Sequence, residues 1–144
     1  MSSAATSTPQ LDEAKLHEFM LKAVGDIGAA MHAVLVILGD RLGLYKAMSD
    51  CKPVTSAELA SRTNTSERYV REWLNANAAS GYLTYNPATK TYALTPEQSL
   101  TLTKEDGPAF LPGAFQVISA CFSDQGKIED AFKTGKGIGW HEHH

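Results

Sequence analysis

The end of the sequence gathers the residue types best suited to chemistry. His141, Glu142, His143 and His144 follow one another there, and imidazole and carboxylate groups are common ligands of zinc. Four adjacent residues rarely offer a preformed tetrahedral site, so we expect no metal site. No Ser/His/Asp set and no paired carboxylates stand out elsewhere, so the residues alone assign no catalytic group.

Just before this cluster, residues 135–139 form the glycine-rich run GKGIG. Glycine-rich loops bind phosphate in nucleotide-binding proteins, where a strand precedes the loop and the glycines have a fixed spacing. This run has neither the spacing of a Walker loop nor that of a dinucleotide fingerprint, and no strand is predicted before it. We interpret it as a flexible loop.

Aromatic residues recur upstream of the loop, and they allow two interpretations. They can form the core of the domain, or they can line an apolar cavity shared with another domain. The sequence leaves both open for Phe110, Phe115, Phe122, Phe132 and Trp140. A short amphipathic helix is predicted over residues 127–133, with Ile128, Ala131 and Phe132 facing inward.

These residues need a scaffold, and residues 54–94 predict a winged helix-turn-helix. A short helix over residues 57–62 precedes a polar turn, and Ser66 begins a second helix that runs to about Ser80. Tyr69, Val70, Trp73 and Leu74 are expected to face inward on that helix. Two β-rich stretches, residues 82–85 and 91–94, would form the wing, and Thr95-Pro96 predicts the start of another helix.

A winged helix-turn-helix can bind DNA, and Ser66, Arg68, Arg71 and Lys90 are the candidate contacts. DNA affinity depends mainly on neutralising phosphates with Lys and Arg. From Val54 to Thr95, four basic residues face three acidic ones, and the whole chain carries a formal net charge of −3. Nucleic acid is therefore not an expected partner, and a DNA-binding transcriptional regulator is the alternative hypothesis.

Residues 11–48 carry the strongest pattern, an apolar stripe with steps of three and four residues that predicts a long helix. A second face of this helix carries the small residues Gly25, Gly28, Ala29 and Ala33. The two glycines weaken an isolated helix, and their presence favours close approach of another backbone at this face. We expect residues 39–43 to bend or interrupt the helix. We also expect a second subunit to cover part of the helix in a homodimer.

The composition is that of an ordinary globular protein. Hydrophobic residues make up 43% and charged residues 20%, and 144 residues can bury a core. Two cysteines are too few for a disulfide framework, which favours a cytoplasmic protein. Residues 1–10 predict a disordered tail, and the longest apolar run, residues 33–38, is too short to span a membrane.

Several stretches are similar to class I S-adenosylmethionine-dependent methyltransferases. They are residues 35–48 (LVILGDRLGLYKAM), 54–60 (VTSAELA), 69–74 (YVREWL), 79–83 (ASGYL) and 92–97 (YALTPE). The arrangement resembles the N-terminal winged-helix dimerisation domain of these enzymes. Residues 110–115 and 137–143 resemble the actinobacterial small-molecule methyltransferases in particular.

The resemblance implies a mainly α fold with a long dimerisation helix, a winged helix-turn-helix and C-terminal helices. It implies domains at residues 11–48, 49–96 and 97–144, the last leading to a Rossmann-like catalytic domain. No strand and glycine-rich turn for S-adenosylmethionine occur here, so this chain alone is expected to bind no cofactor and to be inactive. The resemblance also implies a substrate pocket with Phe115, Phe122, Trp140, His141 and Glu142 as candidate residues.

Overall fold

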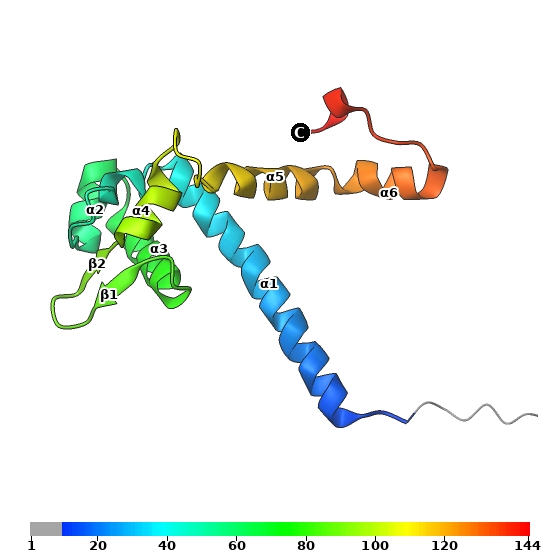
Figure 1. The fold of residues 1–144 in the computed structure, drawn as a ribbon, viewed down its shortest axis with the longest axis horizontal. Helices are drawn as coiled ribbons and strands as arrows, with labels where there is room; N and C mark the ends of the chain where they lie inside the picture. Colours follow the sequence, from blue (N-terminus) through cyan, green and yellow to red (C-terminus); the bar gives the residue numbers. More distant parts are fainter. Residues whose placement is uncertain (1–9) are drawn as a thin grey trace, which may run out of the picture. The chain divides into compact units, whose positions relative to one another are not determined.

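The computed structural model describes residues 10–144, so the predicted tail lies almost entirely outside the described residues. The chain divides into two compact units, residues 1–31 and 32–144, which are described separately. The elements in chain order (Figure 1) are α1 (Glu13–Arg41), the 3-10 turn η1 (Lys46–Met48), α2 (Ser56–Thr63), α3 (Glu67–Ala79), β1 (Thr84–Asn86), β2 (Thr91–Ala93), α4 (Pro96–Thr103), α5 (Pro112–Ser123), α6 (Gln125–Thr134) and the 3-10 turn η2 (Trp140–Glu142). The predicted mainly α winged-helix fold is confirmed.

The first unit consists of the beginning of α1, and its apolar side chains are exposed. Phe19, Met20, Val24, Ile27 and Met31 each expose more than half of their surface. The α1 helix is continuous past this unit and ends at Arg41, within the segment where the glycines were expected to interrupt it.

By length and composition, α1 is also apolar enough to cross a membrane, with a mean hydropathy of 1.7 over its most apolar window. Two features oppose a membrane-spanning role. The C-terminal part of the helix belongs to the folded second unit, where Ala33, Val36 and Ile37 are buried. The N-terminal part carries charged side chains, including an exposed Lys22–Asp26 ion pair of 2.7 Å. We therefore interpret α1 as an amphipathic helix of a folded protein.

In the second unit, the helix-turn-helix begins with a capping box. Thr55 Oγ1 accepts a hydrogen bond from the Glu58 amide at 3.3 Å, and Glu58 Oε2 accepts one from the Thr55 amide at 2.7 Å. After α2, Asn64 adopts a left-handed conformation with a φ of 52°, which ends the helix and directs the chain into α3. Ser66 occupies the predicted N-cap position of α3, but its side chain makes no cap hydrogen bond.

The wing is a two-stranded antiparallel sheet in which Tyr85 lies opposite Tyr92. Val54 adds an isolated bridge, because its amide donates to the Tyr92 carbonyl at 2.9 Å and its carbonyl accepts from the Tyr92 amide at 2.8 Å. A second capping box, between Thr95 and Gln98, begins α4 where the Thr95-Pro96 pair predicts it. The bridge thus joins the wing to the segment before α2.

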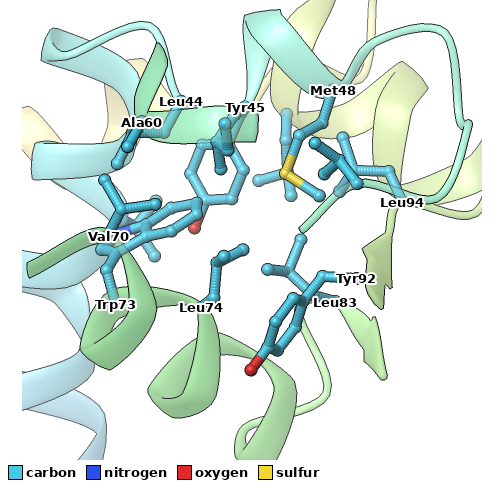
Figure 2. Packing of buried hydrophobic residues seen from close by; sticks show 14 residues of the cluster. Leu44, Tyr45, Met48, Ala60, Val70, Trp73, Leu74, Leu83, Tyr92 and Leu94 are labelled. Carbon is cyan, nitrogen blue, oxygen red and sulfur yellow. The ribbon is translucent and has the colours of Figure 1, made fainter. Parts of the chain in front are cut away.

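One apolar core holds η1, α2, α3, the wing and α4 together (Figure 2). Its buried members are Val36, Leu44, Tyr45, Met48, Val54, Leu59, Ala60, Val70, Trp73, Leu74, Leu83, Tyr92, Leu94 and Leu102. Val36 brings the end of α1 into this core. The Trp73 indole N–H donates to the Leu35 carbonyl at 2.8 Å, which joins α3 to α1.

Gly39 lies where α1 packs against two aromatic side chains of the core. A Cβ atom at this position would lie 2.5 Å from Cζ2 of Trp73 and 2.5 Å from Cε2 of Tyr45. Such distances are far inside van der Waals contact, so only glycine fits here. Gly39 therefore permits two aromatic rings to pack against the helix backbone.

A buried polar pair lies within the same core. The Tyr45 hydroxyl donates to Asn77 Oδ1 at 2.6 Å, and Asn77 Nδ2 donates to the Trp73 carbonyl at 2.9 Å. Burial raises the pKa of the Tyr45 hydroxyl, with smaller contributions from Tyr82 and Asp40, so this group remains a hydrogen-bond donor. Each buried polar group that the pair contributes is thus satisfied.

Two side chains that were predicted to face inward are exposed. Tyr69 on α3 is 75% exposed and Phe132 on α6 is 88% exposed. Tyr69 precedes the buried Val70, so the inward stripe of α3 begins one residue later than predicted. Phe132 belongs to a helix without fully buried residues, because α5 and α6 contact each other but bury little apolar surface.

Candidate functional site

The candidate site is a cavity of about 500 Å³ formed by α5, α6 and the residues around η2. This volume lies within the range of small-molecule sites. Its lining is mostly apolar, includes a few polar groups, and consists of Val117, Ala120, Cys121, Asp124, Ile128, Trp140, His143 and His144. The site therefore combines an apolar wall with a cluster of titratable groups.

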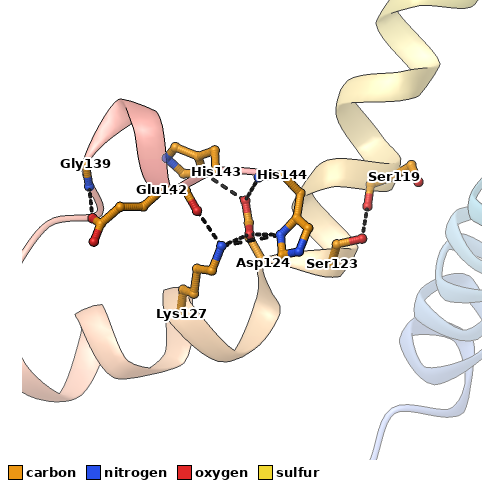
Figure 3. Close-up of polar contacts among 8 residues, drawn as sticks. All are labelled: Ser119, Ser123, Asp124, Lys127, Gly139, Glu142, His143 and His144. Carbon is orange, nitrogen blue, oxygen red and sulfur yellow. Dashed lines mark hydrogen bonds and ion pairs between the residues drawn. The ribbon is translucent and has the colours of Figure 1, made fainter.

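Asp124 is the centre of this cluster and is almost fully buried. It lies at the junction of α5 and α6, so its position is set by the backbone of two helices. Its carboxylate accepts hydrogen bonds from Lys127 Nζ at 2.9 Å, His143 Nδ1 at 2.9 Å, His144 Nδ1 at 2.5 Å and the His144 amide at 3.1 Å (Figure 3). Residues nearly twenty positions apart thus meet at one carboxylate.

These hydrogen bonds keep Asp124 ionised. The Lys127 ammonium, followed by the His144 ring, lowers the pKa of the Asp124 carboxyl well below its usual range. Burial opposes this shift, but the donors outweigh it. Lys127 also donates to the Glu142 carbonyl, so one ammonium links the helix junction to the returning chain. Among residues 10–144, no three His, Cys, Asp or Glu side chains are placed to hold a metal ion.

Of the predicted pocket residues, Trp140 lines the cavity and is 93% exposed overall. Phe122 is exposed on α5, and Phe115 packs against the winged-helix core. His141 and Glu142 are exposed, and Glu142 Oε2 accepts a hydrogen bond from the Gly139 amide at 2.6 Å. The structure does not gather these five residues in one place, and their role in a substrate pocket stays a prediction.

The groups that do converge are not distinguished in the sequence. Asp124 had no helical pattern or motif to distinguish it, and His143 and His144 were considered only as metal ligands. One signal was present, because Asp124 and Lys127 are three residues apart in a segment with few other charges. The glycine-rich residues 135–139 connect α6 to this cluster and contribute Lys136, Gly137 and Ile138 to a neighbouring cavity of about 320 Å³.

Residues 30–104 match the family of the Rv2258c-like winged HTH domain. The match covers more than half of the chain. The chain belongs to this family. The matched residues of the Rv2258c-like domain run from the end of α1 to just past the end of α4 and therefore contain the whole apolar core.

Solved structures similar to this Rv2258c-like chain share its fold. PigF with SAH matches with a TM-score of 0.65 and 22% identity, over 78% of this chain and 36% of PigF. A putative O-methyltransferase from Nostoc punctiforme matches with a TM-score of 0.65 and 18% identity, over 92% of this chain and 37% of its own. Human N-acetylserotonin methyltransferase in complex with SAM matches with the same TM-score and 15% identity, over 94% of this chain and 38% of its own.

The Rv2258c-like chain therefore spans little more than a third of the length of these three structures. No curated protein matches the sequence. At such low identities the similarity establishes the fold, and the fold is one that methyltransferases contain.

The DNA-contact candidates of the Rv2258c-like domain lie on or beside the helix-turn-helix. Ser66 and Arg68 are exposed at the start of α3, and Lys90 lies in the wing turn with a φ of 54°. Arg71 forms an ion pair with Glu67 at 3.8 Å. A further base, Arg62, donates to the Ala47 carbonyl at 3.1 Å, so part of the positive charge is engaged within the domain.

Proposed function

We propose that this chain is the dimerisation and substrate-pocket domain of a cytoplasmic S-adenosylmethionine-dependent methyltransferase whose catalytic domain lies outside the chain. The fold shared with methyltransferases supports this proposal, as does the resemblance of residues 35–48 and 137–143 to that class. The observation that carries it is a row of exposed apolar side chains along α1, from Met20 to Leu38, which we call the seam.

The seam follows a heptad spacing along a continuous helix. Steps of four and three residues alternate through the exposed side chains of Met20, Val24, Ile27, Met31, Val34 and Leu38. This is the spacing with which helices pair in coiled coils. A contiguous apolar surface of this length is unusual on a monomer and is typical of an interface.

A second copy of the chain is the partner that suits this seam. A twofold pair places the same helix face on both subunits, so apolar side chains meet apolar side chains. Gly25 and Gly28 adjoin the seam, and a Cβ at either position would meet nothing within 4 Å. Small residues at these positions leave room for a neighbouring helix to approach closely.

The cofactor is assigned to the catalytic domain because the residues of this chain do not fit it. Among the described residues the one sheet is two-stranded and antiparallel, whereas the S-adenosylmethionine site of this class follows a strand of a parallel sheet. S-adenosylmethionine would supply the methyl group in the full-length protein. The residues of this chain would contribute part of the pocket for the methyl acceptor.

The oligomeric state tests the proposal. Light scattering at micromolar concentration is expected to give twice the chain mass of 15.6 kDa. Ile27→Glu is expected to give the single mass, because it places a charge within the seam. Ile27 is 64% exposed, so the substitution should leave the folding of the chain intact.

Lys22→Glu is the matched control. Lys22 lies on the same helix but outside the seam, and its exposed ion pair with Asp26 contributes only about 0.5 kcal/mol. The control should remain a dimer. A monomeric wild-type chain, or a dimer that survives Ile27→Glu, would contradict the proposal.

A further inference from the structure

Within the second unit, α1 begins with a turn that is joined to the winged helix by one aromatic contact and one hydrogen bond. His32 is the first residue of this unit, and its ring packs on that of Tyr82 with 4.3 Å between ring centroids and 57° between ring planes. At the end of the turn, the Leu35 carbonyl accepts the hydrogen bond of 2.8 Å from the Trp73 indole N–H. We call residues 32–35 the entry turn of α1, because the fully buried Val36 follows it.

The Nε2 atom of His32 is buried and has no hydrogen-bond partner among the described residues. In a neutral imidazole one nitrogen is a donor and the other an acceptor, whereas in the imidazolium both are donors. Protonation would therefore bury a cationic N–H group without an acceptor, which is less favourable than an unpaired neutral nitrogen. Accordingly, burial lowers the pKa of His32 below its ordinary value of 6.5.

The surroundings of His32 offer no charge that would stabilise an imidazolium. Tyr82, the titratable side chain in contact with the ring, contributes a phenol and not a carboxylate. The charged residues nearest to this contact are Asp26 and Asp40 along α1, Glu72 and Lys90 on either side of Tyr82 in the chain, and Glu97 of α4, which lines a small cavity together with Tyr82. Burial is the one cause of the lowered pKa of His32, so none of these charges offsets it.

We propose that His32 is a pH-sensitive switch that controls the attachment of the entry turn to the core. The neutral ring packs on Tyr82, and the entry turn stays joined to α3. In mild acid Nε2 takes up a proton from the solvent, the imidazolium turns out into water, and the hydrogen bond between Trp73 and Leu35 is lost.

The direction of the switch follows from the burial of the ring. Because the pKa of His32 is lowered in the folded state, the neutral ring contributes its full stabilisation above the ordinary value of 6.5. That contribution decreases as the pH falls below 6.5 toward the lower folded value. The switch lies within one chain and does not depend on the proposed dimer. Met31 and Val34 of the seam flank His32, so an effect on pairing would rest on that proposed function.

The indole N–H of Trp73 reports on the switch, because its hydrogen bond to Leu35 protects this proton from exchange with water. NMR of the whole chain measures its exchange rate in the wild type and in His32→Phe, whose ring can pack on Tyr82 but cannot take up a proton. The ratio of the wild-type rate to the variant rate should rise as the pH falls from about 7.5 to about 5.5, the range in which histidine changes its charge.

His17→Phe is the matched control, because His17 is an exposed residue of the same helix that precedes the second unit. The same substitution there should leave the acid response of the Trp73 indole proton as it is in wild type. Tyr82→Leu should uncover the His32 ring, so the pKa of His32 should move back toward 6.5 in a titration of its ring protons. Loss of the acid response in His17→Phe would contradict the assignment to His32.

The titration of His32 in the wild-type chain is the decisive measurement. A pKa at or above 6.5 would show that the Tyr82 ring stabilises the imidazolium through its face, and it would overturn the proposal. An exchange ratio that does not change with pH would overturn it too. Circular dichroism identifies a variant that fails to fold, and if His32→Phe is such a variant, His32→Gln takes its place. A monomer in light scattering would refute the proposed dimer and leave this switch unaffected.

Discussion

The winged-helix core and the α5–α6 region use their apolar residues in opposite ways. Between η1 and α4 the large apolar side chains converge on one buried cluster. In α5, α6 and the junction between them the buried residues are Pro112 and Asp124, whereas Val117, Phe122 and Phe132 are exposed. The first region is stabilised by burial, and the second by helix hydrogen bonds and one polar cluster. The second region thus retains an apolar surface for other molecules.

The largest expected effect that tests this comparison comes from apolar truncations. Leu74→Ala should lower the free energy of unfolding by about 2–5 kcal/mol, because Leu74 is fully buried and leaves a cavity. Phe132→Ala removes more atoms but should change it by less than about 0.5 kcal/mol, because Phe132 is exposed. Urea unfolding followed by circular dichroism measures both. A large loss for Phe132→Ala would mean that α6 is part of the core.

A smaller effect is expected from adding a single methyl group to glycine. Gly39→Ala should destabilise the fold by about 1–3 kcal/mol, because the new Cβ would overlap Trp73 and Tyr45. Gly113→Ala on α5 is the control, since its Cβ would meet nothing within 4 Å and alanine favours helices by about 0.5 kcal/mol. Thermal unfolding should therefore shift in opposite directions. Equal shifts would contradict the tight packing at Gly39.

The smallest expected effect is local and depends on pH. Because the folded-state pKa of Asp124 is depressed, its contribution to docking residues 143 and 144 is present above the ordinary aspartate pKa of 3.8. That contribution is lost only as the pH falls through the lower folded value. The NMR shift of the His144 amide should therefore stay constant as the pH falls through 3.8 and change only in stronger acid. In the Asp124→Asn variant, the chemical shift of the His144 amide should not change over this acidic range.

The sequence predicts the winged helix well because its signals are local. Thr55 with Glu58 and Thr95 with Gln98 are capping boxes that can be read from residues three apart. Inward faces are harder to assign, since Tyr69 and Val70 are both suited to a core and only the packing decides between them. Gly39 was interpreted as a helix interruption, and its contact with two distant aromatic rings is not visible in local sequence.

The candidate site was less predictable because its groups come together through contacts between residues that are distant in the sequence. Asp124 meets His143 and His144 through the return of the chain after α6, and no periodic pattern encodes that return. The domain boundaries at residues 48 and 96, the dimer and the pocket residues stay predictions.

The placement of the two tryptophans has an optical consequence. Trp73 is 5% exposed in the winged-helix core, and Trp140 is 93% exposed beside the cavity. A water-soluble quencher such as iodide should reach the indole of Trp140 and spare that of Trp73. The fluorescence that remains after quenching should come from Trp73 and should lie at shorter wavelength, because its indole is in an apolar environment. The chain thus carries one tryptophan in each of its two contrasting regions, and the signals of the two can be separated without a label.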